Sequence, residues 1–226
     1  MLELNGQTAV VTGAAKGIGR GIAIALSRRR CHLALADIDE TSLVRTAKEI
    51  AASGVRVSHY RLDVADAEAV AAFPDIVKRE HGGVDLLVNN AGVALGGTFE
   101  QISESDFEWL FAINFWGAVR MTRAFLPLLH LSDEGRLVCI SGLIGLVATS
   151  IAKSARLPKG MSGEEAAHKL RQAEAMLKMR PEAVGEIIVR GVERRRARVL
   201  VGSRAKIAER LFPVSYWKLI GWRMKL

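Results

Sequence analysis

The fold of this 226-residue chain is decided by Thr12-Gly13-Ala14-Ala15-Lys16-Gly17-Ile18-Gly19, a glycine-rich stretch between an apolar strand pattern and a helical pattern. Gly13 permits a tight turn, Gly17 allows a ligand to approach the backbone, and Gly19 allows the helix to pack closely on the strand. The N-terminus of this helix directs free N–H groups and the positive end of its dipole at the loop. The stretch therefore predicts a binding site for phosphate groups.

Short apolar runs alternate with helical patterns on both sides of this loop, which is typical of a parallel sheet with helices on each face. The runs are also apolar enough for strands that are covered on both faces. The predicted strands are Thr8–Thr12, His32–Ala36, Arg56–Tyr60, Val84–Val88 and Arg136–Ile140. We expect a three-layer, doubly wound α/β fold of the Rossmann type that forms a single domain over residues 1–226.

Several helix ends carry recognisable signals. Asp39 and Asp66 are suited to cap the helices that follow them, and the second helix is expected to end near Gly82. Ser103-Glu104-Ser105-Asp106 has the capping-box pattern, so a third helix is expected to begin there and to continue to Pro127 or slightly beyond.

The pattern changes after Thr149, and residues 151–226 are expected to form the variable, substrate-determining part of the domain. We predict helices over Ser162–Met179 and Pro181–Arg195, since a proline suits the first turn of a helix. Arg198–Val201 is predicted to add one more strand to the sheet.

Asp37 closes the second predicted strand, 18 residues after Gly19. A carboxylate at this point can accept hydrogen bonds from both hydroxyls of an adenosine ribose and would repel a 2′-phosphate, which favours NAD over NADP. Lys16 argues mildly in the other direction, because its ammonium group could approach that phosphate. The sequence thus predicts a dinucleotide cofactor, NAD more than NADP.

The Thr-Gly spacing of the loop resembles that of the short-chain dehydrogenase/reductase family, and three further motifs match in the same order. Asp63-Val64 resembles the pair that lies against the adenine ring, and Asn89-Asn90-Ala91-Gly92 resembles the family's segment at the cofactor cleft. Asn114 matches the helix asparagine whose backbone holds a water in the family's proton relay. The cofactor-binding residues that the resemblance implies are Thr12, Gly13, Lys16, Gly17, Ile18, Gly19, Asp37, Asp63, Val64, Asn90, Ala91 and Gly92.

The catalytic part of the resemblance is incomplete. The family uses a serine, a tyrosine and a lysine four residues after the tyrosine, but neither Tyr60 nor Tyr216 is followed by such a lysine. Ser141 resembles the family's serine with a shift of one residue, because Gly142 occupies the usual position, and such a shift turns a strand side chain to the other face. The resemblance therefore implies Asn114 and Ser141 as catalytic residues and leaves the proton donor unassigned.

Comparison with the family pattern indicates that about 40 residues, a helix and a strand, are missing between Ala148 and Thr149. Either the protein contains this segment and the present sequence lacks it, or the protein has lost it together with the chemistry. Loss of both elements would leave unpaired backbone groups and an uncovered sheet face, at about 1–3 kcal/mol for each buried group. Because a domain is held by only roughly 5–15 kcal/mol, we favour the first explanation.

Charge and composition limit the classes of partner that this protein can be expected to bind. The net charge of +8 arises in the C-terminal third, since residues 1–150 carry −3 and residues 151–226 carry +11. The basic residues lack the interleaved aromatics of a nucleic-acid groove, so no nucleic acid is expected. Cys31 and Cys139 are interpreted as reduced core thiols, and no metal site is expected. No leader precedes the first strand, so a cytoplasmic location is expected.

The sequence thus predicts an oxidoreductase that transfers hydride between nicotinamide and a secondary alcohol or ketone, most suitably a hydrophobic one. The resemblance also implies a homodimer or homotetramer. Two alternatives remain open. The first is a catalytically inactive dinucleotide-binding module without the tyrosine and lysine, and the second is a peripheral membrane protein that binds through its basic, aromatic tail, residues 213–226.

Overall fold

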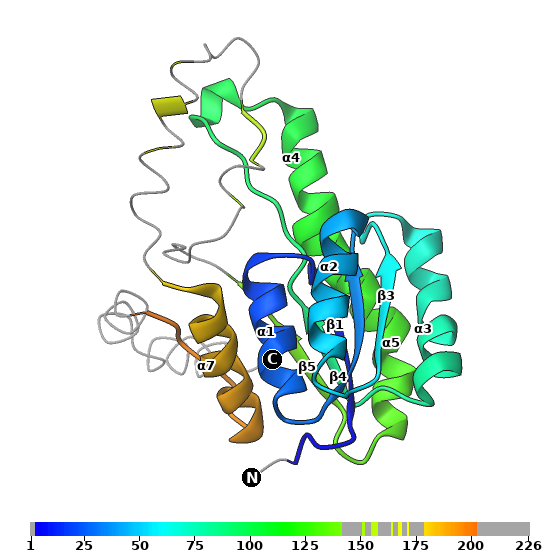
Figure 1. Ribbon diagram of the computed structural model, residues 1–226. Coiled ribbons are helices and arrows are strands. Elements are labelled where there is room, and N and C mark those ends of the chain that lie inside the picture. The colour runs from blue at the N-terminus through cyan, green and yellow to red at the C-terminus, as the bar shows by residue number, and fades with distance from the viewer. Residues whose placement is uncertain are drawn as a thin grey trace, which may run out of the picture.

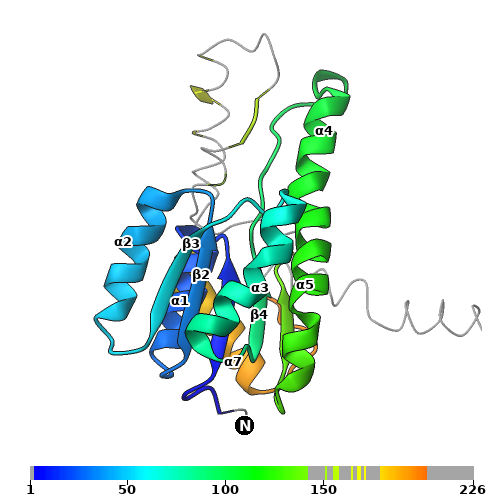
Figure 2. The ribbon, with the colours of Figure 1, turned by 90° about the vertical axis from the view of Figure 1, so that its right-hand side faces the viewer.

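The computed structural model describes residues 3–141, 151, 155–157, 164, 167–168, 171 and 179–202. Five strands form one sheet in the order β3-β2-β1-β4-β5, and every pair is parallel. The strands are β1 (Thr8–Thr12), β2 (His32–Asp37), β3 (Val57–Arg61), β4 (Leu86–Asn89) and β5 (Arg136–Cys139). The predicted α/β fold with a parallel, doubly wound sheet is confirmed (Figures 1 and 2).

Alternation along the strands divides the core into two layers. In β1, Ala9 and Val11 face one cluster of buried residues, whereas Val10 faces the other. All three side chains are fully buried. This explains why the strands read as continuous apolar runs, because both faces of the central strands are covered.

Helices cover the two faces of the sheet. One face carries α1 (Gly17–Ser27), α2 (Glu40–Ala51) and α7 (Pro181–Glu193), whose apolar residues share a cluster. The other face carries α3 (Ala67–His81) and α5 (Ala118–Leu131). The remaining helical segments are η1 (Phe99–Gln101), α4 (Glu104–Phe111) and the π-helical η2 (Ala112–Gly117), which joins α4 to α5.

The predicted caps are present at three helices. Asp39 accepts a hydrogen bond from the backbone N–H of Ser42 at the start of α2, and Asp66 accepts two at the start of α3. Ser103 caps α4, and Gly82 ends α3 in the left-handed conformation with φ +85°. The helical run beginning at α4 continues past Pro127 to Leu131, within the range expected from the sequence.

Two predictions about local structure are wrong. Arg198–Val201 is irregular, because no strand of the described sheet lies beside it. Cys139 is exposed, although Cys31 is buried as expected, because β5 pairs only with β4 among the described residues and one of its faces is uncovered. Ser162–Met179 lies mostly outside the described residues, so that predicted helix is not assessed.

The order of the strands defines where a ligand site belongs. The chain proceeds from β1 outward to β3 and then returns to β4 on the other side of β1. In open sheets of this kind, ligands bind outside the carboxyl ends of the strands where the order reverses. The glycine loop after β1 and the segment after β4 meet at this point. Within the described part of the chain, no helix combines the length and hydropathy needed to cross a membrane.

Candidate functional site

Thr12 joins the ends of β1 and β4. Its hydroxyl accepts hydrogen bonds from the N–H groups of Asn90 and Ala91, both at 3.0 Å, and donates to the carbonyl of Val88 at 3.3 Å. The side chain is almost fully buried, with 1% exposed. One hydroxyl therefore satisfies two backbone donors that the end of the sheet would otherwise leave unpaired.

Asn90 holds the glycine loop from the other side. Its amide nitrogen donates to the carbonyl oxygens of Thr12 at 3.0 Å and Gly13 at 3.1 Å. An ideal Cβ added to Gly13 would lie 2.8 Å from this nitrogen, and one added to Gly19 would lie 2.1 Å from the Gly13 oxygen. Both contacts are too close for a side chain, so the loop and the helix require glycine at these positions.

The N-terminus of α1 differs from those of α2, α3 and α4. Lys16 occupies the N-cap position, no side chain caps the first turn, and that turn contains no acidic residue. Gly17 begins the helix with φ +55°, a conformation that glycine adopts at little cost. The first N–H groups of α1 therefore have no side-chain cap and are available to an anion. Ile18 packs against the core below them.

Asp37 ends β2 beside this loop. One carboxylate oxygen accepts a hydrogen bond from the N–H of Ala15 and the other from the N–H of Asp39, both at 2.9 Å. The side chain is half-buried. Each oxygen retains a further lone pair, so the carboxylate is held in place and can still accept hydrogen bonds from a ligand.

Lys16 forms an ion pair at the surface of the loop. Its ammonium group lies 2.5 Å from the carboxylate of Asp39. This hydrogen bond to Lys16, together with the N-cap bonds of Ser42, lowers the pKa of Asp39 to about 2. From the sequence, Lys16 was expected to favour NADP slightly, because its ammonium group could approach a 2′-phosphate. The ion pair with Asp39 weakens this expectation.

Asp63 and Val64 follow β3 at the same edge of the sheet. Asp63 is exposed and accepts a hydrogen bond from the N–H of Ala65 at 2.9 Å. Val64 is buried and packs against Gly117, where an added Cβ would lie only 2.7 Å from Cγ2 of the valine. Asp63 is therefore open to a ligand, whereas the side chain of Val64 supports the π-helical segment.

Asn114 lies in that π-helical segment, η2. Its amide donates to the carbonyl of Val93 at 2.9 Å and accepts from the N–H of Val93 at 2.8 Å. Gly92 lies directly below, and a Cβ there would approach the Asn114 oxygen to 3.3 Å. Extra residues in a helix often occur at functional sites, because they redirect backbone groups. The two-point contact fixes the segment after β4 against η2.

Ser141 lies just beyond β5, at the same edge of the sheet, and is exposed. The preceding residue, Ile140, donates its N–H to the carbonyl of Asn89. Tyr60 lies on β3, at the far edge of the sheet, where its hydroxyl donates to Glu80 at 2.6 Å. Burial, followed by this hydrogen bond, raises the pKa of Tyr60. Tyr60 therefore lies at the other edge of the sheet from Ser141 and is not placed to act with it on one substrate. Tyr216 is outside the described residues.

Two sets of side-chain contacts were not predicted from the sequence. Asn89 is buried and donates to the hydroxyl of Thr122 at 3.0 Å, while its own oxygen has no hydrogen-bond partner among the described residues. The guanidinium of Arg156 lies 3.7 Å from the ring centroid of Trp109 and 3.5 Å from the carboxylate of Asp106. The Asn89-Asn90 pair of the family-like motif could have drawn attention to Asn89. The contact of Arg156 with α4 joins distant parts of the chain, and no local sequence signal predicts it.

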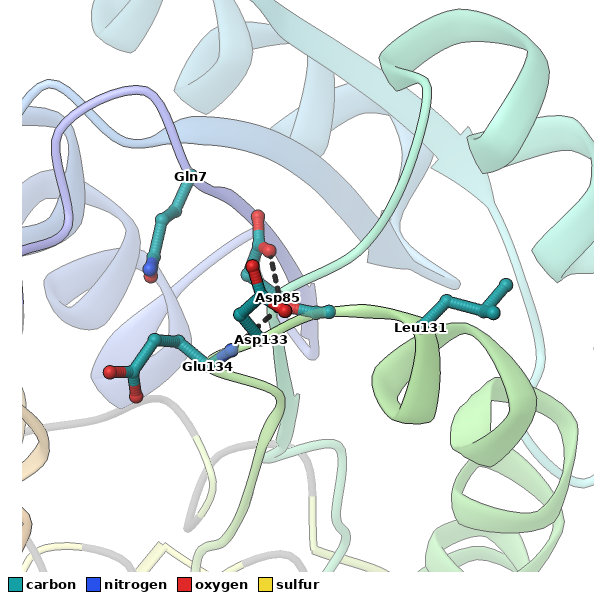
Figure 3. A pocket seen from close by; sticks show the side chains of 6 residues that line it. Gln7, Asp85, Leu131, Asp133 and Glu134 are labelled. Atoms are coloured by element: carbon teal, nitrogen blue, oxygen red, sulfur yellow. Dashed lines mark hydrogen bonds between the residues drawn. The ribbon is translucent and has the colours of Figure 1, made fainter.

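A hollow of about 440 Å³ lies at the opposite end of the sheet, where β1 and β4 begin (Figure 3). Asp85 accepts hydrogen bonds there from the N–H of Thr8 at 2.8 Å and from the hydroxyl of Ser132 at 2.6 Å. The Asp85 carboxylate in this hollow is thus already hydrogen-bonded within the protein. The lining residues are Gln7, Asp85, Leu131, Ser132, Asp133 and Glu134. In the part of the chain that is described, no group of three or more His, Cys, Asp or Glu could hold a metal.

Comparison with known proteins gives the family. The family model described as short chain dehydrogenase matches residues 7–154, a range that contains every cofactor-binding and catalytic position expected from the sequence. The chain belongs to the short-chain dehydrogenase family. A Mycobacterium tuberculosis protein, SadH, is named an oxidoreductase and is 33% identical over 266 residues, covering 97% of this chain and 96% of that protein.

The length of that alignment bears on the missing segment. It extends over 266 positions, whereas the chain has 226 residues, so at least 40 positions of the relative have no counterpart here. The Escherichia coli oxidoreductase UcpA is 38% identical over a shorter stretch of 145 residues, which covers 64% of this chain and 55% of that protein.

Solved structures show the same architecture. A short-chain dehydrogenase/reductase from Burkholderia phymatum in complex with NAD has a TM-score of 0.84 and 26% identity, covering 93% of this chain and 94% of that chain. A metagenomic short-chain oxidoreductase in complex with NADP has a TM-score of 0.66 and 28% identity, covering 85% and 92%. Relatives of similar likeness thus hold either dinucleotide.

Proposed function

We propose that this protein is an NAD-dependent oxidoreductase that transfers hydride between nicotinamide and a secondary alcohol or ketone. The observation that carries the proposal is the uncapped N-terminus of α1 with Asp37 beside it. The phosphates would lie against the glycine loop, and the adenosine ribose would lie at Asp37. When bound, NAD supplies the hydride acceptor, and its reduced form supplies the donor.

The residues at the loop fit a dinucleotide. Added Cβ atoms at Gly13 or Gly19 would overlap backbone or amide atoms, and the first turn of α1 presents N–H groups without an acidic neighbour. Asn90 and Thr12 hold this loop through hydrogen bonds of 3.0–3.1 Å, so the N–H groups are oriented before a ligand arrives.

The preference for NAD rests on charge. Asp37 is held by two backbone donors and would stand close to a 2′-phosphate, which its carboxylate would repel. Lys16, the cation nearest to it along the loop, is already paired with Asp39.

The proposed catalytic roles belong to Asn114 and Ser141. Ser141 would donate a hydrogen bond to the substrate oxygen, and Asn114 would act as a positioning residue that holds the segment after β4 against η2. A general acid contributes about 10²- to 10⁴-fold to such a reaction. That group has to come from a tyrosine outside the described residues or from the segment that this sequence lacks.

A second candidate is a dinucleotide-binding protein without turnover. It is favoured by one observation, namely that the hydroxyl of Tyr60 is bound to Glu80 on the far edge of the sheet. Both candidates bind NAD, and they differ in catalysis. A protein of 24.6 kDa that binds NADH but oxidises no secondary alcohol would be the inactive module.

Titration with NADH and NADPH, followed by fluorescence, tests the proposal. The protein is expected to bind NADH more tightly, and Asp37→Asn should weaken NADH binding about ten-fold by loss of charge-assisted hydrogen bonds while improving NADPH binding. Asp75→Asn, an exposed change on α3, is the matched control and should leave both affinities unchanged. Absence of NADH and NADPH binding to folded protein at millimolar concentration would overturn the proposal.

A further inference from the structure

Helix α1 ends in an unusual way. The N–H of Cys31 donates to the carbonyl of Leu26 at 3.2 Å, and the N–H of Arg30 donates to that of Ser27 at 2.9 Å. This is the Schellman arrangement, in which the residue at Arg30 takes a left-handed conformation and is usually glycine. Here it is an arginine with φ +63°.

Helix α7 ends in the same way. The N–H of Arg196 donates to the carbonyl of Gly191 at 3.0 Å, and the N–H of Arg195 donates to that of Val192 at 2.9 Å. Arg195 has φ +53°, again at the position where glycine is favoured. Arg30 and Arg195 are the two residues other than glycine with positive φ in the described part of the chain.

The two helix ends are neighbours. Arg20 near the start of α1 pairs with Glu182 near the start of α7, and Arg29 beyond the end of α1 pairs with Glu186 and Glu193. The helices therefore run parallel and finish at the same end of the molecule, as Figure 1 shows for α1 and α7. Together they place two arginine-rich turns side by side.

Several exposed arginines gather at this end, next to the hollow that Asp85, Asp133 and Glu134 line. Arg29 forms an ion pair with Glu186, and Arg195 forms one with Glu134. Glu186 and Glu193 are thus already engaged. Four further arginines are exposed and form no ion pair with any described residue, and we call them the arginine end: Arg28, Arg30, Arg194 and Arg196.

Helix stability explains only part of this arrangement. A basic side chain near a helix C-terminus interacts favourably with the helix dipole, and one or two suffice at each helix. The dipole does not explain why arginine replaces glycine at both left-handed positions. Residues that occupy unfavourable backbone conformations are often retained for function.

We propose that the arginine end binds the anionic headgroups of a lipid membrane surface. Arginine offers several donors that match phosphate oxygens, and its charge attracts an anionic leaflet. A cluster of exposed arginines suits an anionic membrane surface, whereas the described residues offer no aromatic platform there for nucleotide bases.

This surface lies away from the candidate dinucleotide site. The arginine turns follow the C-terminal ends of α1 and α7, whereas the glycine loop precedes the N-terminal end of α1. Binding to vesicles should therefore leave the affinity for NADH unchanged. Failure of either the membrane inference or the proposed function can thus be recognised separately.

Co-sedimentation with vesicles tests the inference. The full chain should pellet with vesicles that contain phosphatidylglycerol, but not with phosphatidylcholine alone, and salt at about 0.5 M should release it. The triple variant Arg28→Gln/Arg30→Gly/Arg194→Gln should bind more weakly by on the order of a hundred-fold, about five-fold for each arginine. Arg30→Gly alone should weaken binding about five-fold without lowering the melting temperature, because glycine suits φ +63°.

A matched variant removes charge elsewhere. Arg45→Gln/Arg61→Gln/Arg123→Gln takes three exposed basic residues from α2, β3 and α5, none of them in the last turn of a helix, and should bind vesicles nearly as well as the parent chain. Equal loss in the two triple variants would overturn the inference, because net charge alone would then explain binding. Binding abolished only by deletion of residues 213–226, or binding to duplex DNA and not to vesicles, would also overturn it.

Discussion

Replacement of Thr12 by valine is expected to destabilise the fold at the point where the candidate site is built. Valine has nearly the same shape but no hydroxyl, so the N–H groups of Asn90 and Ala91 lose their acceptor. Thr12 is 1% exposed, which leaves little room for water to replace it. Each buried donor without a partner costs about 1–3 kcal/mol, and we expect a total loss of about 3 kcal/mol.

A loss of this size should be easy to measure. For a chain of this length, about 3 kcal/mol corresponds to a decrease of roughly 6–12 °C in the melting temperature. Thr12→Ser is the matched control, because it keeps the hydroxyl and removes only a methyl group, at about 1 kcal/mol. Urea unfolding of both variants gives the comparison. If the valine variant is as stable as the serine variant, the hydroxyl does not hold the two strand ends together.

Three further outcomes are expected. The pKa of Glu186 is lowered to about 2 by its bond to Arg29, so the stabilisation is present above the unfolded value of about 4.3 and is lost as pH falls toward 2; melting curves of Glu186→Gln and the parent should differ at pH 7 and converge at low pH. Alkylation of the native protein should modify Cys139, which is exposed, and spare Cys31, which is buried and whose pKa is raised to about 12; modification of both at equal rates would contradict the fold. Gly185→Ala should destabilise by about 1–3 kcal/mol despite better helix propensity, because its Cβ would lie 2.2 Å from the α1 backbone; an unchanged melting temperature would show that α1 and α7 separate freely.

Local signals in the sequence predicted much of the fold. Asp39, Asp66 and Ser103 cap helices because each side chain bonds N–H groups two or three residues away, which depends on few other parts of the chain. Gly82 ends α3 for an equally local reason, its positive φ. Such short-range bonds are the kind of interaction that sequence patterns record.

Features that depend on long-range contacts were not predicted correctly from the sequence. Arg198–Val201 was predicted to be a strand, but a strand requires a neighbour, and none of the described strands lies beside this segment. Cys139 was expected to be buried, yet an edge position exposes it. The pairing of Lys16 with Asp39, which changes its expected role, depends on the approach of two separate loops.

The sequence by itself determined which residues meet at the candidate dinucleotide site. The glycines, Asp37 and the double asparagine have the spacing that parallel strands demand, because each follows a strand whose carboxyl end reaches one edge of the sheet. Only the tertiary structure decided which charges remain available. The distance between groups far apart in the chain sets whether a charge is paired, so Lys16 is bound to Asp39, whereas Arg28 and Arg30 stay exposed at the far end of α1.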